Sequence, residues 1–415
     1  MIALLRMRGY ALVWWAALAS RIGNWALVVA LHVYLFEQTG SPLAVSGVFV
    51  AYYIPGLAFG SVAGVFADRW DRRRTMIAAN VAQAVAVLFL LLIGPSGPLW
   101  FAYIVAFADA SMAQLFAPAD NALLPRLVPD DRLMSANVVN SVNDHLARTV
   151  GPAIAGFVVA VGGLHAAALV DSASFVISAA LIALVRPRDL RDPADATLVP
   201  RTRGGDASAT PGRNFGGDLI DGLRAIRSST VLSRLLLVVS VTAIAWSFVQ
   251  TLLVPFVVDV IHAGAETVGV ALAVRGVAGL AAGLALSSIA DRLPRVATIA
   301  VSTLASGVVL IGQSIYPATL VLVAAMAVIG PAFVVASTSQ RTMMQAEVGD
   351  RYRGRVFGGY ATANALVILL GNVGAGLAAE VAGIVPVLVA SGALFMLGGV
   401  LAITVIPERQ SQSAV

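Results

Sequence analysis

Residues 60–94 read GSVAGVFADRWDRRRTMIAANVAQAVAVLFLLLIG. The stretch is apolar up to Phe66, carries two aspartates and four arginines over residues 68–74, and is apolar again over residues 75–94. A bilayer core about 30 Å thick is crossed by roughly 20 helical residues, so the second apolar segment is long enough for one crossing. Arginine-rich loops stay on the cytoplasmic side. The stretch therefore predicts two membrane-spanning helices joined by a cytoplasmic loop.

The same pattern continues along the whole chain of 415 residues. Hydrophobic residues make up 59% of the chain and charged residues 12%, whereas a soluble domain carries roughly 25% charged residues. Long apolar segments separated by charges or turn residues predict an all-α integral membrane protein with twelve spanning helices. The predicted spans are 10–36, 42–66, 75–94, 99–122, 136–161, 164–186, 233–258, 266–290, 296–315, 317–343, 356–381 and 384–406.

The distribution of arginine predicts the orientation of the chain. All 27 basic residues are arginines, and alternate connections, together with the span ends that border them, hold every one of them except Arg21, Arg148 and Arg275. The opposite set of connections holds none, so both termini are expected in the cytoplasm. The protein is expected to be a multi-pass protein of the plasma (inner) membrane. Because the loops account for the basic charge, no nucleic-acid partner is expected.

Two pairs of motifs recur at nearly the same offset, which indicates an internal duplication. Residues 151–156, GPAIAG, correspond to residues 371–376, GNVGAG, at an offset of 220 residues. The Asp-Arg pair at residue 68 has a counterpart at residue 291, an offset of 223 residues. Two pseudo-symmetric six-helix bundles with a site between them are a recurring transporter architecture. The predicted organisation is an N-terminal bundle over 1–186, a cytoplasmic linker over 187–232 and a C-terminal bundle over 233–415.

The linker has two parts with different composition. Residues 187–214 are rich in Pro, Arg, Asp and Gly and are predicted to be disordered. Residues 216–229 place Leu219, Leu223 and Ile226 on one helical face. This spacing predicts a short amphipathic helix lying on the cytoplasmic membrane surface.

The loop sequence that opens this section resembles the segment between the second and third helices of the major facilitator superfamily, in which an acid follows a glycine by four residues and precedes a basic cluster. Asp71 stands where many members have glycine, so the local turn is expected to differ. The resemblance implies that Asp68 docks at the N-terminus of helix 11 near Gly358 when the cytoplasmic side is closed; the alternative is that the loop only sets topology. The residues that fill this switch motif are Gly64, Asp68, Arg69, Arg72 and Arg73.

Further segments are similar to the branch that contains macrolide-efflux and enterobactin-type exporters; they are residues 20–23, 39–42, 118–125, 135–152 and 353–358. Gly151, Pro152 and Gly156 resemble the helix-5 glycine-proline motif of drug–proton antiporters, and such small residues allow close helix packing. The resemblance implies a proton-coupled secondary exporter of small amphipathic molecules, such as antibiotics or siderophores, working by alternating access.

Other classes of function remain alternatives at this stage. One is movement of lysophospholipids or other lipids, and another is a membrane receptor that binds without transporting. An enzyme is not expected, since the chain contains no cysteine, no P-loop and no paired histidines. No metal and no cofactor are predicted, and the expected partners are protons, a small amphipathic substrate and the bilayer, with the protein a monomer.

Charged residues within the predicted spans are the candidate functional residues, because each costs about 2.5–3.5 kcal/mol on insertion scales. Asp144 and Arg148 are four residues apart, which predicts either a self-neutralised pair or a protonatable Asp144 released from Arg148. Asp109 has no basic partner in its own helix, so Arg21 is its predicted partner. Asp109 is predicted either to bind a proton or a cationic substrate, or to be a structural residue. Many relatives have an acid where this chain has Asn24, which moves the predicted coupling site to Asp109 or Asp144.

Three further predictions concern the remaining helices. Asp171 lies in a segment that looks like a structural signature of helix 6. Arg275 either binds an anionic substrate group or fixes an acid in the other half. Trp246 is a candidate for stacking on a flat substrate, whereas Trp14 and Trp15 are predicted interface anchors.

Overall fold

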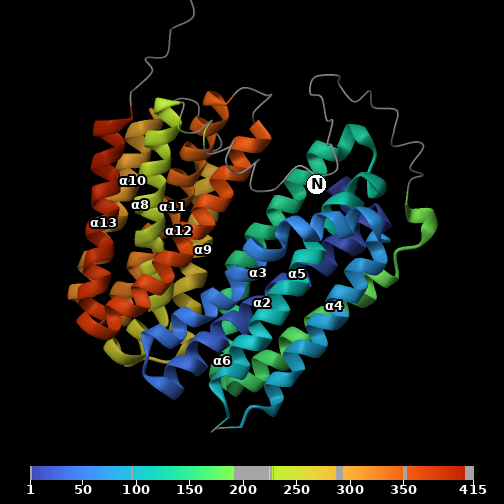
Figure 1. Cartoon of the computed structure of the whole chain (residues 1–415), viewed down its shortest axis with the longest axis horizontal. Coiled ribbons are helices and arrows are strands. Elements are labelled where there is room, and N and C mark those ends of the chain that lie inside the picture. The colour runs from blue at the N-terminus through green and yellow to red at the C-terminus, as the bar shows by residue number, and fades with distance from the viewer. Residues whose placement is uncertain are drawn as a thin grey trace, which may run out of the picture. The chain divides into compact units, whose positions relative to one another are not determined.

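The structure is a computed structural model that describes residues 2–94, 97–190, 229–286, 293–348 and 353–406, with Arg224 and Arg227. Every regular element in these ranges is a helix (Figure 1), and the two linker predictions fall almost entirely outside them. The elements are α1 Ile2–Leu5, α2 Arg8–Thr39, α3 Pro42–Arg69, α4 Arg72–Leu88, η1 Phe89–Leu92, α5 Leu99–Leu127, η2 Asp130–Arg132, α6 Leu133–Ala183, η3 Pro187–Asp189, α8 Thr230–Pro255, η5 Phe256–Val260, α9 Ala265–Leu286, α10 Arg295–Ile315, α11 Thr319–Glu347, α12 Arg353–Ala382 and α13 Ile384–Val405.

The described helices confirm the all-α membrane fold. Eleven of them are long and apolar enough to cross a membrane, and the one that includes α6 runs for 54 residues. Gly162 and Gly163 break α6 into two crossings. Gly163 has φ 58°, a conformation that glycine adopts without the penalty imposed by a Cβ atom. The two halves of α6 therefore supply the fifth and sixth predicted spans, which makes twelve crossings among the described helices.

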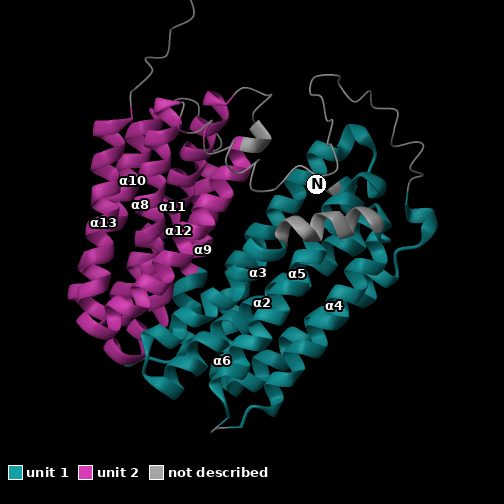
Figure 2. Ribbon diagram, in the orientation of Figure 1, with its two compact units in different colours: residues 1–203, 262–273 teal, residues 204–261, 274–415 magenta. Residues whose placement is uncertain are grey.

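The chain divides into two compact units (Figure 2). Unit 1 comprises residues 1–203 and 262–273, and unit 2 comprises residues 204–261 and 274–415. Within unit 1, α2 packs along α6, α4 packs on α5 and α6, and α3 packs on α5. Within unit 2, α8 packs on α12 and α13, and α10 packs on α11 and α13. The helix pairs of one unit thus have counterparts in the other.

Side-chain contacts inside each unit repeat at the offset seen in the sequence. A Cβ atom on Gly151 would lie 2.5 Å from Trp25 Cδ1, and one on Gly371 would lie 2.8 Å from Ser247 Cβ. These two contacts join equivalent helices, α2 with α6 and α8 with α12, at offsets of 220 and 222 residues. The glycines let each helix pair approach closely.

A second repeated contact joins the third crossing of each unit to the sixth. Asn80 Nδ2 donates to Ser178 Oγ over 3.0 Å in unit 1. In unit 2, a Cβ atom on Gly399 would lie 2.9 Å from Thr303 Oγ1. Matching contacts at matching offsets support the internal duplication that the motifs predict.

The loop before α4 stabilises helix ends within unit 1. The Asp71 carboxylate caps α4 by accepting from the Arg74 backbone N–H at 2.8 Å, which accounts for an aspartate at this position. Arg72 donates to the Ala122 carbonyl at 2.9 Å. Arg73 donates to the carbonyls of Ile182 and Ala183 at the end of α6, where unpaired carbonyls favour a cation.

The side chains of Asp68 and Arg69 and the surroundings of Gly64 are not described, although α3 includes the backbone of all three residues. The proposed docking of Asp68 therefore stays a prediction. Arg72 and Arg73 of the same loop have side-chain partners within unit 1.

We predict that Gly151→Val and Gly371→Val each lower stability by about 1–3 kcal/mol, because a larger side chain overpacks a tight helix contact. Thermal unfolding of the purified protein in detergent measures the effect. Gly374→Val is the matched control, since nothing lies within 4 Å of a Cβ atom at that glycine. Equal stability of all three variants would contradict the repeated contact.

Candidate functional site

A polar cavity of about 500 Å³ lies inside unit 1. Helices α2, α3, α4, α5 and α6 all contribute side chains to it. Charged and amide side chains line it at the depth of the apolar spans, where they are rare and usually functional. These polar residues are Arg21, Asn24, Asn80, Gln83, Asp109, Gln114, Asp120, Asn121, Asp144 and Arg148.

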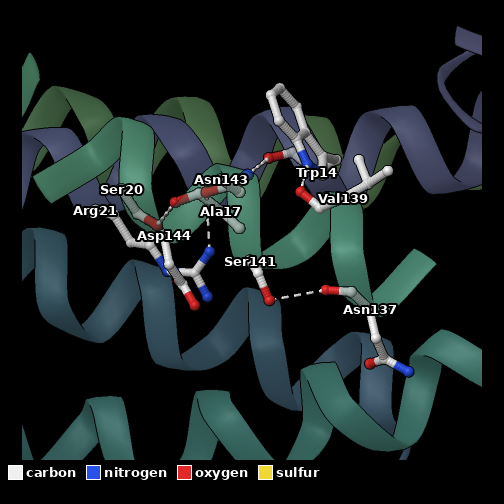
Figure 3. A network of polar contacts seen from close by, with 9 residues as sticks. All are labelled: Trp14, Ala17, Ser20, Arg21, Asn137, Val139, Ser141, Asn143 and Asp144. Atoms are coloured by element: carbon white, nitrogen blue, oxygen red, sulfur yellow. Dashed lines mark hydrogen bonds and ion pairs between the residues drawn. The ribbon is translucent and has the colours of Figure 1, made fainter. Parts of the chain in front are cut away.

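Arg21 of α2 is held by two neighbouring residues of α6 (Figure 3). Its Nε lies 3.3 Å from Asp144 Oδ1, and its Nη1 donates to Asn143 Oδ1 over 2.9 Å. Asn143 is 1% exposed and donates in turn to the Trp14 carbonyl at 2.7 Å. Trp14 Nε1 donates to the Val139 carbonyl at 3.1 Å. The network therefore joins α2 to α6 over about two helical turns.

This network corrects two sequence predictions. Asp144 pairs with Arg21 rather than with Arg148, because the α6 face that carries Asp144 packs on α2. Among the described residues no carboxylate lies within ion-pair distance of Arg148, which lines the same cavity. Trp14 is buried rather than an interface anchor, whereas Trp15 is 52% exposed.

Polar residues recur every three or four positions along the first half of α6, and this polar stripe divides between two roles. Asn140 Oδ1 accepts from the Tyr10 hydroxyl at 2.9 Å, so this residue faces α2 with Asn143 and Asp144. Asn137 and Ser141 are exposed and donate to backbone carbonyls of their own helix. Only part of the stripe therefore reaches the cavity.

Asp109 of α5 is 1% exposed and is bound by two amides. Asn24 Nδ2 donates to Oδ2 over 3.1 Å, and Gln83 Nε2 donates to Oδ1 over 2.9 Å. The prediction that Arg21 pairs with Asp109 is wrong, because Asp144 and Asn143 hold that guanidinium. Asn24 serves as a donor here, where an acid would place a second carboxylate against Asp109.

Asp120, which was not predicted as a functional residue, lines the same cavity. It is half-buried on α5 and interacts electrostatically with Arg21 and Asp144. The signal was its spacing: Asp120 follows Asp109 by 11 residues, about three helical turns, so both acids share one face. Pro118 and Pro125 lie within α5 on either side of Asp120, and because proline has no backbone N–H, the carbonyls four residues before each lack their helical donor.

The helix-5 motif forms a close helix crossing in unit 1. A Cβ atom on Gly156 would lie 2.5 Å from Gly269 Cα, and one on Gly269 would lie 3.0 Å from the Pro152 carbonyl oxygen. Gly269 belongs to α9, whose first turns group with unit 1. Small residues on both helices allow this backbone contact, and a larger side chain at either glycine would separate the helices.

Unit 2 contains a separate aromatic and cationic cluster. The Arg275 guanidinium carbon lies 5.0 Å from the centre of the Trp246 ring, and the ring of Phe333 lies 5.1 Å from Trp246 at 31°. This cation–π stack brings together α8, α9 and α11. The two residues predicted as separate candidates, Arg275 and Trp246, therefore form one cluster.

The described residues contain no group of three or more His, Asp or Glu side chains arranged to hold a metal ion. The chemistry that the cavity offers is hydrogen bonding and charge pairing. Proton binding by carboxylates is the further possibility that its buried acids present.

Comparisons with known proteins identify relatives of this chain. Residues 13–372 and 235–415 match the family model described as Major Facilitator Superfamily. An uncharacterized MFS-type transporter of Bacillus subtilis, YfiS, is 26% identical over 405 residues, covering 95% of this chain and 92% of its own length. Macrolide efflux protein A of Streptococcus pyogenes is 26% identical over 349 residues and covers 83% of each chain. The multidrug efflux pump Tap of Mycobacterium bovis is 24% identical over 355 residues, covering 84% of this chain and 81% of its own.

Solved structures share the fold at lower sequence identity. The nucleoside transporter NupG superposes with a TM-score of 0.70 at 14% identity, covering 95% of this chain and 98% of that one. A bacterial homologue of the iron transporter ferroportin, in an inward-facing state, superposes with a TM-score of 0.71 at 15% identity, covering 96% and 98%. These likenesses support the fold.

We predict that Asn143→Ala destabilises the protein by about 1–3 kcal/mol, because the Arg21 guanidinium and the Trp14 carbonyl both lose a buried partner. Thermal unfolding measures this effect. Asn137→Ala is the matched control, since Asn137 is exposed and donates only to its own helix, and it should change stability by less than about 0.5 kcal/mol. Equal losses of stability in the two variants would show that the hydrogen-bond network of Asn143 does not stabilise the protein.

Proposed function

This chain belongs to the major facilitator superfamily, and on that premise we propose that it is a proton-coupled exporter of small amphipathic molecules. Members of this family are multi-pass membrane transporters of small molecules, not enzymes, and the chain is one of them. Two relatives that align over most of their length are named efflux proteins. Their names favour export over import for this chain, and antibiotics or other drugs as its substrates.

The observation that carries the proposal is the charged cavity of unit 1. Its volume of about 500 Å³ lies within the range of small-molecule sites, about 300–1,000 Å³. It is lined by three carboxylates, Asp109, Asp120 and Asp144, and by two arginines, Arg21 and Arg148. With all of these ionised, the lining has an excess of one negative charge. A substrate with an amine and several hydrogen-bonding groups complements this surface.

Asp109 is the proposed coupling residue. It is buried, it lines the cavity, and among the described residues its carboxylate is bound only by the amides of Asn24 and Gln83. An ionised Asp109 attracts a cationic substrate group, and a protonated one does not, so proton and substrate compete for it. Each proton moving inward through 100 mV supplies about 2.3 kcal/mol, which drives export against a gradient.

Asp144 is the second coupling candidate. It is ion-paired with Arg21, so its ionised form has a counter-charge that Asp109 lacks. We propose that this ion pair joins α2 and α6 at the cavity wall. Asp120 also interacts electrostatically with Arg21 and provides a second negative charge for it. Arg148 remains a candidate contact for an anionic part of the substrate.

The remaining predicted residues have supporting roles in this proposal. Trp246, stacked with Arg275, offers a flat aromatic surface in unit 2 for a planar part of the substrate. Gly151, Pro152 and Gly156 allow close helix packing at α6. The switch motif, Gly64, Asp68, Arg69, Arg72 and Arg73, is proposed to hold the cytoplasmic side closed during alternating access.

We predict that expression raises resistance to a macrolide carrying an amino sugar, and that a protonophore abolishes this resistance. Asp109→Asn should reduce proton-driven export into acidified inside-out vesicles by at least about tenfold, or 1.4 kcal/mol, because the neutral amide neither binds a proton nor attracts a cation. Asp131→Asn is the matched control, since the Asp131 side chain is 76% exposed. Export by Asp109→Asn at the control rate would overturn the assignment.

The same vesicles distinguish the competing functions. Movement of labelled lysophospholipid in place of the drug would make the protein a lipid transporter. Macrolide binding to purified protein without counterflow in proteoliposomes would make it a receptor. Either result would contradict the proposed export.

We predict that Arg21→Gln alone reduces export about tenfold, because it leaves Asp144 without its counter-charge, and that the double variant Arg21→Gln with Asp144→Asn recovers most of the loss. Initial rates of macrolide export in vesicles measure both effects. Recovery supports a neutralising ion pair. A double variant as inactive as Asp109→Asn would instead make Asp144 the proton carrier.

A further inference from the structure

Asp171, on the second half of α6, is a second buried carboxylate close to Asp109. Asp171 is 0% exposed and Asp109 is 1% exposed. The two carboxylates interact electrostatically. The signature segment that contains Asp171 predicted a structural residue, and the proposed function above gives it no role.

Neighbouring helices place the two acids against the same turns. On α2, Asn24 donates to Asp109, while a Cβ atom on the adjacent Gly23 would lie 2.9 Å from Asp171 Oδ1. On α4, Gln83 donates to Asp109, while the adjacent Ala84 carbonyl accepts from Ser172 at 3.1 Å. On both α2 and α4, therefore, one residue contacts Asp109 and the residue next to it contacts the helical turn that contains Asp171.

The hydrogen bonds of the two carboxylates are unequal. Asp109 accepts one amide N–H on each oxygen. Asp171 Oδ1 has only a 3.4 Å contact with Ser174 Oγ, and among the described residues its Oδ2 has no partner. The Tyr52 hydroxyl interacts electrostatically with both acids. It is also buried, and it has no hydrogen-bond partner among the described residues.

Two ionised carboxylates without a counter-ion are strongly unfavourable in a buried site, and such a pair holds one proton between its members. Among the described residues neither carboxylate forms an ion pair. The two amide donors favour the ionised form of Asp109, and among the described residues Asp171 has no comparable donors, so a proton held by the pair resides on Asp171. Asp109 lines the cavity together with the titratable groups Tyr52, Arg21, Asp120, Asp144 and Arg148.

We propose that Asp109 and Asp171 form one proton-binding unit, and that a cationic substrate group at Asp109 displaces their shared proton into the cavity water. The exchange is balanced in charge: the carboxylic acid of the pair loses a proton to water, and the substrate cation neutralises the negative charge that this proton had neutralised. Protonation from the opposite side reverses the step and releases the substrate. This inference rests on the proposed proton-driven export and names the second acid that it uses.

The pair is tested without a substrate by infrared difference spectroscopy of the purified full-length protein during a pH titration. The wild type should show the C=O stretch of a protonated carboxylic acid at neutral pH, and this band should disappear at high pH. Asp171→Asn should remove the band, since it is isosteric with the protonated acid and leaves Asp109 with its two amide donors. Asp109→Asn should move the loss of the band to lower pH, because the neighbouring negative charge is gone.

Asp131→Asn is the control and should keep the wild-type band at the wild-type pH. Thermal unfolding checks that each variant is folded. A wild-type spectrum without a protonated carboxyl group at neutral pH would overturn the pair, as would a band that Asp171→Asn leaves in place.

Transport separates this inference from the function on which it rests. Macrolide export into vesicles by Asp171→Asn should no longer respond to an imposed pH difference, while downhill macrolide counterflow persists. If Asp171→Asn responds to the pH difference like the wild type, the pair is wrong and proton-driven export stands. If the wild type itself shows no response, the proposed coupling fails whatever the infrared spectra show.

Discussion

The structure depends on one constraint, the cost of leaving a polar group unpaired inside membrane-spanning helices. Water cannot satisfy such groups in the hydrocarbon region, so each needs a partner within its own bundle. In unit 1 this requirement joins α2 to α6 through Arg21, Asn143 and Asp144. It also joins α5 to α2 and α4 through the amides on Asp109. The partners that satisfy the charges are therefore also the contacts that fix the helix arrangement around the cavity.

Close backbone packing is the second requirement, since lipid supplies no hydrophobic force that drives helices together. Glycines at helix contacts meet this need in both units, as Gly151 does against Trp25 and Gly371 against Ser247. Gly23 allows α2 to approach the Asp171 turn closely. The repeated contacts are consistent with a duplicated scaffold. Buried polar residues differ between the two units: Asp171 corresponds to Ser391, which donates to the Ala245 carbonyl at 2.7 Å.

An amide instead of an acid at position 24 affects how negative charge is distributed in unit 1. Asn24 provides a donor to Asp109, so negative charge is concentrated on α5 and the second half of α6 rather than on α2. This arrangement brings Asp109 and Asp171 together and leaves Arg21 free to compensate Asp144 and Asp120. The proposed coupling by a buried pair of acids rests on that distribution of charge.

Apolar length and turn chemistry are local properties, so the residue pattern alone predicted the number of crossings and the break at Gly162 and Gly163. The same pattern predicted most of the charged residues within the spans, although Asp120 was missed. Their partners could not be predicted in this way. Arg21 pairs with Asp144 rather than Asp109, and Trp246 with Arg275, because helix rotation and packing set which side chains meet, and residue spacing along one helix does not specify either.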